Sequence, residues 1–292
     1  MLRAGAAAAS VLPGGVGRAL AETAGLGAAR LPARAVAGRR ALVRRHLRRV
    51  VGPGVATARL EGMVDEAFAS YARYWAESLR LPSLADHELE AAMSVRGFGH
   101  LHDAAAAGRG VILALPHLGG WEWGGTWLAR TGWQVSVVVE VLGSPDVFEW
   151  FAGFRSGLGM EVIPNGPAAA SACLRALRAG RVLCLLSDRV VGATPGVTVD
   201  LFGAPARLPA GAATLALRSG APVLPAAVYF TGGGGHLAVV RPPVGVRRGP
   251  GRLRDDVEAG TAGLARELEA LIAAAPTQWH LFQPLWDDDP PL

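Results

Sequence analysis

Residues 111–124 read Val111-Ile-Leu-Ala-Leu-Pro-His117-Leu-Gly-Gly-Trp-Glu122-Trp-Gly. A short apolar run that ends at a proline is typical of a buried strand. Gly119 and Gly120 permit a tight turn and a close approach by a substrate, and Glu122 would lie in the first turn of a following helix. The stretch therefore predicts a strand, a histidine, a glycine turn and a helix, the order found at the active-site edge of an α/β fold.

Similar apolar runs continue along the chain and alternate with stretches of helical pattern. Further strands are expected at Val135–Val139, Val182–Leu186, Val223–Phe230 and Leu237–Val240. Helices are expected at Trp121–Arg130, Asp146–Ser156, Ala168–Ala179, Ala210–Ser219 and Arg252–Ala275. This alternation predicts an α/β fold with a largely parallel central sheet flanked by helices. Gly232 to Gly235 should form a hairpin turn between the last two strands, and no helix follows them that could make a phosphate cradle.

The two ends of the chain differ from this core. The first 105 residues read as helical, which predicts a helical, membrane-associating portion at 1–105 and an α/β catalytic core at 106–292, in one continuous domain. One buried helical stripe is expected from Met63, Val64, Ala67, Phe68, Tyr71 and Trp75. The apolar tail Trp279–Trp286 should pack back onto the body, and Asp287–Asp289 should end the chain in solvent.

A basic helix is expected at residues 39–51. Its arginines at 44, 45, 48 and 49 share one face, and Leu42, Val43, Leu47 and Val50 share another. Such a helix could lie on an anionic leaflet, or it could be an ordinary core helix with a solvated face. The segment Ala4–Ala29 is broken by Pro13 and Glu22 and reads as an uncleaved surface-seeking segment. No stretch reaches the roughly 18–20 apolar residues that span a bilayer.

Composition excludes several classes of enzyme. The chain of 292 residues is 51% hydrophobic, is 18% charged and carries a net charge of +5, and all 29 of its basic residues are arginines. Without lysine it can form neither a Walker A phosphate loop nor a Schiff base. Cys173 and Cys184 are too few for a disulfide framework or a thiolate metal site, which fits a reducing cytoplasmic location.

His117 is the candidate catalytic residue. A neutral imidazole can take the proton of an alcohol as the alcohol attacks a carbonyl, and a carboxylate on the other ring nitrogen would fix the tautomer. The sequence has no Gly-x-Ser-x-Gly elbow and no His-Glu-x-x-His, which argues against a serine hydrolase and a zinc protease. On these residues alone, His117 could equally be a structural histidine.

Several segments together carry a family resemblance. They are His117-Leu-Gly-Gly-Trp-Glu122, Ser70–Glu77, Phe154–Pro164, Leu186–Arg189, Val199–Gly211 and Gln278–Trp286. The first resembles the His-x4-Asp/Glu motif of the glycerolipid acyltransferase superfamily. The rest are similar to the lipid A lauroyl/myristoyl acyltransferase branch, and in particular to its phosphatidylinositol mannoside acyltransferases. The resemblance runs from about residue 35 to residue 286.

The resemblance implies transfer of a long, palmitoyl-like fatty acyl chain from acyl-CoA to the 6-hydroxyl of a mannose on phosphatidylinositol mono- or dimannoside. His117 would be the general base, and Asp188 or Glu122 the acid that pairs with it, with Asp188 expected to orient the ring. The residues expected to bind phosphate are Arg155, Arg189 and Arg207. The residues expected to line the pocket are Gly119, Gly120, Trp121 and Pro225.

The resemblance also implies which partners the protein has. Acyl-CoA is a co-substrate, with no bound cofactor and no metal. The other partners are the mannoside glycolipid and an anionic membrane surface, and no nucleic acid is expected. The protein would lie peripherally at the cytoplasmic face of the plasma membrane. Three alternatives stay open: a lipid A precursor or another glycolipid as acceptor, a non-enzymatic lipid-binding protein of the same fold, and a thioesterase-like hydrolase.

Overall fold

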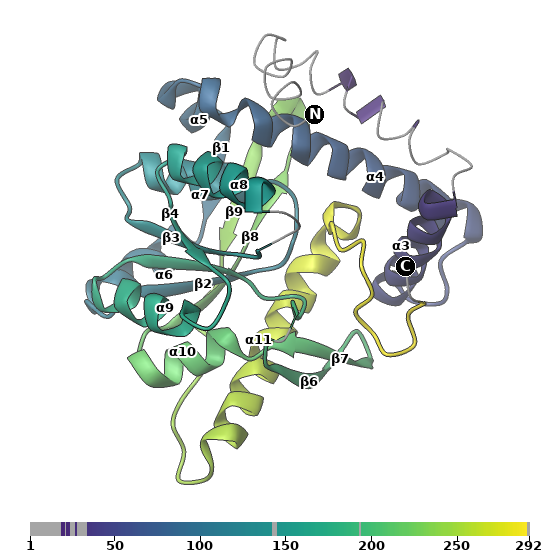
Figure 1. The fold of residues 1–292 in the computed structure, drawn as a ribbon. Helices are drawn as coiled ribbons and strands as arrows, with labels where there is room; N and C mark the ends of the chain where they lie inside the picture. Colours follow the sequence, from purple (N-terminus) through teal and green to yellow (C-terminus); the bar gives the residue numbers. More distant parts are fainter. Residues whose placement is uncertain are drawn as a thin grey trace.

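The computed structural model describes residues 19–20, 22–23, 27, 34–141, 145–192 and 194–290. A seven-stranded sheet forms the centre of this part, with the strand order β1-β9-β8-β2-β5-β3-β4 (Figure 1). Its strands are β1 (Met93–Arg96), β2 (Val111–Leu115), β3 (Val135–Val139), β4 (Glu161–Pro164), β5 (Val182–Leu186), β8 (Val223–Phe230) and β9 (His236–Val240).

The sheet is parallel over five of its strands. β2 pairs in parallel with both β5 and β8, and β3 and β4 extend the parallel order from β5. β9 runs antiparallel to β8, and β1 lies parallel to β9 at the edge. The predicted α/β fold with a largely parallel sheet is therefore confirmed, and the expected hairpin turn joins β8 to β9.

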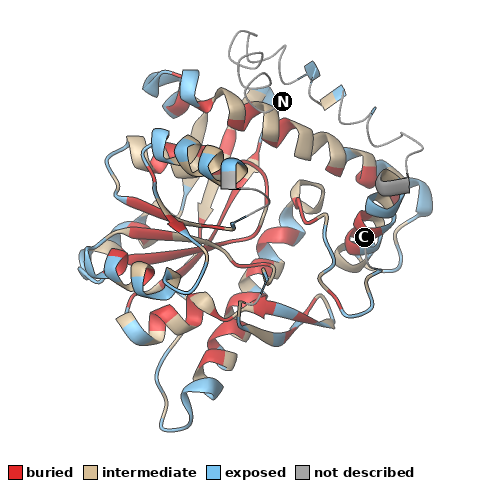
Figure 2. Ribbon diagram, in the orientation of Figure 1, coloured by how far each residue is buried: buried red, intermediate tan, exposed pale blue. Residues whose placement is uncertain are grey.

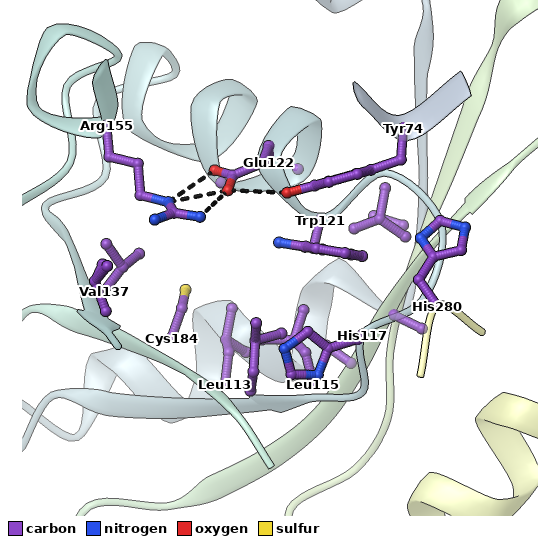
Figure 3. Close-up of a pocket in the computed structure, with 18 of the residues that line it drawn as sticks. Tyr74, Leu113, Leu115, His117, Trp121, Glu122, Val137, Arg155, Cys184 and His280 are labelled. Atoms are coloured by element: carbon purple, nitrogen blue, oxygen red, sulfur yellow. Dashed lines mark hydrogen bonds and ion pairs between the residues drawn. The ribbon is translucent and has the colours of Figure 1, made fainter. Parts of the chain in front are cut away.

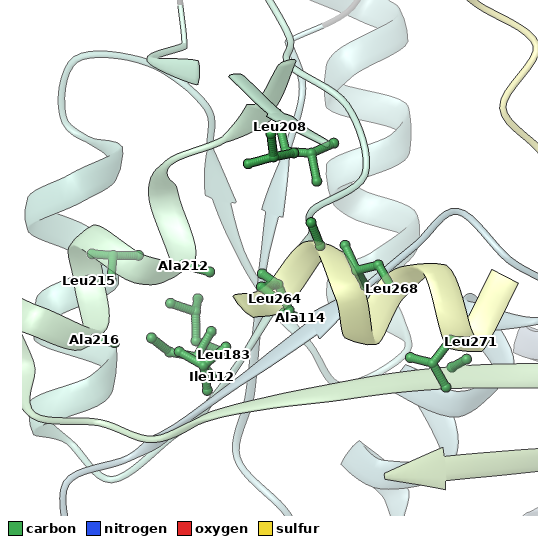
Figure 4. Close-up of a cluster of buried hydrophobic side chains, with 14 of the residues drawn as sticks. Ile112, Ala114, Leu183, Leu208, Ala212, Leu215, Ala216, Leu264, Leu268 and Leu271 are labelled. Carbon is green, nitrogen blue, oxygen red and sulfur yellow. The ribbon is translucent and has the colours of Figure 1, made fainter. Parts of the chain in front are cut away.

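Helices cover both faces of the sheet. On one face lie α5 (Asp86–Ala91), α6 (Phe98–Ala106), α7 (Trp121–Arg130) and α8 (Pro145–Gly157), and on the other lie α9 (Ala169–Arg178), α10 (Gly211–Ser219) and α11 (Leu253–Ala274). Successive β2 side chains point to opposite faces. Leu113 and Leu115 pack toward α7, whereas Ile112 and Ala114 pack toward α10 and α11 (Figure 4). Because a fully buried leucine-sized side chain contributes about 1.5–3 kcal/mol, both faces stabilise β2.

A small antiparallel hairpin stands apart from this sheet. It consists of β6 (Gly196–Leu201) and β7 (Ala204–Pro209), and β6 packs against α11. Its turn places Phe202 at a φ of 52°, an unusual backbone conformation for a bulky side chain. Neither strand was expected from the sequence, because proline and glycine in this stretch are typical of loops.

Within the described residues, one strand, β1, interrupts the helices of the N-terminal portion. α3 (Arg34–Val51) and α4 (Thr57–Arg80) precede the short helices η1 (Leu81–Ser83) and α5, and then β1 joins the edge of the sheet. The expectation that the first 105 residues are helical is therefore wrong at β1. This strand is only four residues long and its side chains alternate between half-buried and exposed, so it lacks the apolar run of the central strands.

The apolar side of α3 packs against the protein itself. Leu42, Val43 and Leu47 are at most 3% exposed, and Figure 2 shows the buried side of this helix facing inward. Arg44 forms an ion pair with Glu61 of α4. The geometry thus favours a core helix over a helix whose apolar side enters a leaflet.

The acidic C-terminal tail lies only partly in solvent: Asp287 and Asp288 are exposed as expected, whereas the side chain of Asp289 is buried against α3. Asp288 forms ion pairs with Arg45 and Arg49, and Asp289 contacts the buried ring of His46, with 2.9 Å between Oδ2 and Nε2. Burial alone would raise the pKa of Asp289. Hydrogen bonds from His46 and from two backbone N–H groups outweigh burial and lower this pKa to about 2. The ion pairs of Asp288 and the hydrogen bond between Asp289 and His46 therefore hold the tail against α3.

Replacing Asp289 with asparagine is expected to lower the free energy of unfolding at neutral pH by about 1–3 kcal/mol, the usual range for a lost hydrogen bond to a charged group. Because the folded pKa lies below the unfolded one, this stabilisation is present above about pH 4 and is lost as the pH falls toward 2. Urea unfolding at several pH values measures the difference. Asp287→Asn, at an exposed neighbour, is the control. If the two proteins still differ equally in the free energy of unfolding at the lowest pH, the ionised carboxylate of Asp289 is not what stabilises the tail.

Among the described residues, no helix is both long enough and apolar enough to cross a bilayer. The surface-seeking segment expected at residues 4–29 lies mostly outside the described residues.

Candidate active site

His117 lies just past the carboxyl end of β2, as the sequence predicts. The chain then turns at Gly119, whose φ is +60°, and α7 begins at Trp121. A Cβ atom at Gly119 would lie 2.1 Å from the carbonyl oxygen of Val228 in β8. Only glycine fits this turn, because both the backbone conformation and the contact with β8 exclude a side chain.

Asp188 holds the ring of His117. It follows the end of β5, next to β2 in the sheet, so the two residues meet at one edge. The Nδ1–H of His117 donates to Asp188 Oδ1 over 2.6 Å, and the backbone N–H of His117 donates to Oδ2 over 2.9 Å. Burial alone would raise the pKa of Asp188. The nearby His117 ring and the hydrogen bonds that the Asp188 carboxylate accepts outweigh burial and lower this pKa. With the carboxylate ionised, the proton sits on Nδ1 and leaves Nε2 as a free base.

The C-terminal tail completes this arrangement. The indole N–H of Trp279 donates to Asp188 Oδ2 over 2.8 Å. The backbone N–H of His280 donates to the carbonyl oxygen of His117 over 2.7 Å, and Gln278 accepts from the N–H of Gly119 over 2.9 Å. Three consecutive tail residues therefore fix the acid, the base and the glycine turn. The sequence predicted that this tail packs on the body, but not that it contacts Asp188.

Replacing Trp279 with phenylalanine is expected to lower kcat about tenfold, the equivalent of about 1.4 kcal/mol in the activation barrier. A smaller aromatic ring remains, but Asp188 loses one of its donors and can rotate away from His117. In an Asp188→Asn background the same change should have no further effect, because both changes act through one carboxylate.

The matched control is Trp286→Phe, since this equally buried indole donates to the carbonyl oxygen of Leu201 instead. Steady-state kinetics of all four variants measures the coupling. Equal losses of kcat from Trp279→Phe and Trp286→Phe would assign Trp279 a purely structural role.

Glu122 binds Arg155, and neither residue contacts His117. The guanidinium Nε–H of Arg155 donates to both Glu122 oxygens, over 2.9 and 3.2 Å, and the hydroxyl of Tyr74 donates to Oε1 over 3.3 Å (Figure 3). Glu122 is only 4% exposed. Burial alone would lower the pKa of Arg155, but Glu122 outweighs burial and raises it. The structure thus decides the alternative left open by the sequence: Asp188, and not Glu122, pairs with His117.

An apolar pocket of about 600 Å³ opens beside His117. Its floor is the face of the sheet that carries Leu113, Leu115 and Val137, and α4, α6, α7 and α8 enclose it. The later half of the expected α4 stripe, from Phe68 to Trp75, lines this pocket, whereas the earlier half is in the core. The volume lies within the range of ligand pockets, about 300–1,000 Å³.

The candidate residues divide between the pocket and its surroundings. Trp121 and Arg189 are on its walls, and Arg189 donates to Glu140 over 2.8 Å. Arg207 lies exposed on β7 and does not line the pocket, so the structure does not bring it to His117 with the other candidates. The remaining three candidates do not line the pocket as expected. Gly119, Gly120 and Pro225 contact neighbouring strands instead.

Several wall residues were not singled out from the sequence. They are Arg39 at α3, Tyr74, Glu140 and His280. Burial, together with the nearby charge of His117, lowers the pKa of His280 to about 3, so this ring is neutral at physiological pH. Its Nε2 lies 2.8 Å from the hydroxyl oxygen of Ser70. The segments that carry His280 and Tyr74 stand out in the sequence only through the family resemblance.

Comparison with known proteins agrees with this geometry. Residues 5–288 match the model of the family described as bacterial lipid A biosynthesis acyltransferase. The chain belongs to this acyltransferase family. It is 37% identical over 250 residues to a phosphatidylinositol mannoside acyltransferase of Mycolicibacterium smegmatis, covering 85% of this chain and 79% of that protein. It is also 37% identical over 250 residues to the protein of the same name from Mycobacterium tuberculosis, covering 84% of this chain and 76% of that protein.

Family membership makes this protein an enzyme that transfers acyl groups. The acyltransferase carries a histidine with a free Nε2, a buried carboxylate on its Nδ1 and an apolar pocket beside it. The described wall residues offer no serine or cysteine next to the histidine as an enzyme nucleophile; Cys184 is in the pocket floor, where burial raises its pKa to about 12. The arrangement suits direct attack by a substrate hydroxyl that a general base deprotonates.

Proposed function

We propose that this acyltransferase moves a long, palmitoyl-like acyl chain from acyl-CoA to the 6-hydroxyl of a mannose on phosphatidylinositol mono- or dimannoside. The observation that carries the chemistry is the His117–Asp188 pair at the edge of a pocket of about 600 Å³. The names of the two mycobacterial relatives support the acceptor. The proposal that acyl-CoA is the donor rests on the resemblance and on the apolar lining of the pocket.

The proposed reaction needs one base and one leaving group. The acyl chain lies in the apolar pocket, with the thioester beside His117. Nε2 of His117 takes the proton of the mannose hydroxyl as its oxygen attacks the thioester carbonyl, and Asp188 stabilises the resulting imidazolium. The intermediate collapses, the C–S bond breaks, and the imidazolium returns its proton to the CoA thiolate. Within this pathway Glu122 supports the pocket wall through Arg155.

Arginines at the pocket are the candidates for binding the phosphates of CoA or of the inositol lipid. Arg39 and Arg189 both line the pocket. Arg155 was expected in this role, but its guanidinium is directed at Glu122, and Arg189 likewise donates to Glu140, so Arg39 is the better candidate. Because the acceptor is a lipid, we place the enzyme peripherally at the cytoplasmic face of the membrane.

A lipid A precursor is the second candidate acceptor, because the matching family model is described by lipid A biosynthesis. A non-enzymatic lipid-binding role is less well supported, since such a role has no physical need for a buried carboxylate on a histidine. A thioesterase would use the same base but would acylate no lipid.

The experiment is transfer of radiolabelled palmitoyl from palmitoyl-CoA to purified phosphatidylinositol monomannoside, phosphatidylinositol dimannoside and a lipid A precursor, in parallel. Labelled mannoside supports the proposal. Labelled lipid A precursor alone would move the acceptor to the second candidate. Release of CoA without any labelled lipid would indicate a hydrolase. Flotation with vesicles that contain or lack phosphatidylinositol tests the membrane placement separately.

A further inference from the structure

Two side-chain polar atoms in the pocket walls are buried without a hydrogen-bond partner within the described part of the chain. They are Nε1 of Trp121 and Nδ1 of His280. An indole nitrogen is always a donor, whereas the donor state of the neutral His280 ring depends on its bond with Ser70. A buried N–H without an acceptor costs about 1–3 kcal/mol, so the folded enzyme holds Trp121 in an unfavourable state. A substrate atom that accepts from this N–H would relieve that cost.

The indole is held next to the base. Its ring packs edge-on to the His117 ring at 5.5 Å between centroids and stacks on Tyr74 at 4.0 Å. Figure 3 shows the indole nitrogen of Trp121 and one ring nitrogen of His117 pointing into the same open part of the pocket. The other ring nitrogen of His117 is bound to Asp188, so the one that faces the pocket is the free base.

Three other side-chain donors of the pocket walls already have acceptors. Arg155 and the hydroxyl of Tyr74 both donate to Glu122. Arg189 donates to Glu140. Each of these would have to give up an existing bond to bind a substrate oxygen, whereas the N–H of Trp121 would not. A donor that is fixed before the reaction is what stabilises developing charge most effectively.

We propose that the indole N–H of Trp121 is an oxyanion donor of the acyl-transfer reaction, an inference that rests on the proposed function. As the acceptor oxygen bonds to the thioester carbon, its proton moves to His117 Nε2 and the carbonyl electron pair moves onto the carbonyl oxygen. The Trp121 N–H donates to that oxyanion. When the carbonyl re-forms, the C–S bond breaks, and the proton passes from His117 to the CoA thiolate. Trp121 is therefore a catalytic residue and more than a part of the wall.

The chain contains a matched control two residues away. Nε1 of Trp123 is equally buried and equally without a partner, but Trp123 stacks on His236 at 4.1 Å and does not line the pocket. Trp121→Phe and Trp123→Phe each remove one unpartnered indole N–H from the same helix. Any effect of helix packing or of lost aromatic area should be similar in both variants.

The test measures CoA thiol release from palmitoyl-CoA, with and without mannoside acceptor, because transfer and slow hydrolysis both pass through the oxyanion. Trp121→Phe should lower kcat by about 10²–10³-fold, the usual loss for one oxyanion donor, with little change in KM. Trp123→Phe should stay within about threefold of wild type. Trp121→His, which can keep a ring N–H in this position, should recover part of the loss, and this variant also serves if Trp121→Phe folds poorly.

The outcomes separate the two proposals. Equal kcat for Trp121→Phe and Trp123→Phe, in folded proteins, would overturn the role of Trp121 and leave the proposed function intact. Thiol release without acylated mannoside would overturn the acceptor, while a selective loss in Trp121→Phe would still support the oxyanion donor. No thiol release by wild type would overturn both.

Discussion

Replacing His117 with alanine is expected to lower kcat by about 10²–10⁴-fold, the range that general acid–base catalysis usually contributes. Nε2 is the free base that faces the pocket, and alanine leaves no group in its place. Binding of palmitoyl-CoA should change little, because the chain is held by the apolar pocket. Transfer of radiolabelled palmitoyl measures kcat, and equilibrium binding of the same donor measures affinity.

The control for this variant is His87→Ala, which removes an exposed histidine on α5. It should leave both measurements at the wild-type level. Because His117→Ala also removes a ring N–H donor from the buried Asp188, urea unfolding must show that the variant is folded before its kcat is compared. If His117→Ala keeps more than a third of the wild-type kcat, the histidine is structural and the base must be sought elsewhere.

The sequence predicts the central strands closely because their residues are buried on both faces. Val111–Leu115, Val135–Val139 and Val182–Leu186 have the expected bounds, since short continuous runs rich in valine and leucine are typical of strands buried on both faces. β1 lacks this signal, because an edge strand needs only one buried face. The hairpin of β6 and β7 lacks it as well, because Pro205 and Pro209 are tolerated outside the central sheet.

The sequence predicts only part of the candidate site, because it does not show which residues far apart in the chain meet in the fold. Position at the end of a strand identifies His117, and the family resemblance points to Asp188. Spacing cannot say which charges meet across the fold: Glu122 is five residues from His117, yet it binds Arg155, which is 33 residues away. The same holds for the tail, where Trp279 contacts Asp188 over a separation of 91 residues. Such pairings follow from the tertiary packing and not from any local pattern.

The ion pair of Glu122 and Arg155 makes a second strong prediction. Replacing Arg155 with methionine is expected to lower the free energy of unfolding by about 3–5 kcal/mol, because it leaves a carboxylate buried without its counter-charge. Among the described residues, Tyr74 alone would remain to bind the Glu122 carboxylate, through a single hydrogen bond of 3.3 Å. Methionine keeps most of the volume and the apolar contacts of the arginine stem, so the loss reports the charge. Urea unfolding at neutral pH measures it.

The double variant Glu122→Gln/Arg155→Met should recover most of this loss, since a neutral amide is less costly to bury than an unpaired carboxylate. Arg254→Met is the matched control: its partner Glu258 is also an acid on a helix, but the arginine is 86% exposed, and exposed pairs contribute about 0–1 kcal/mol. A loss below 1 kcal/mol in Arg155→Met would mean that Glu122 finds another partner or water. A loss of the expected size would show that Arg155 compensates the buried charge of Glu122 in the pocket wall. Asp188 already binds Nδ1 of His117, so this role of Glu122 differs from that of Asp188.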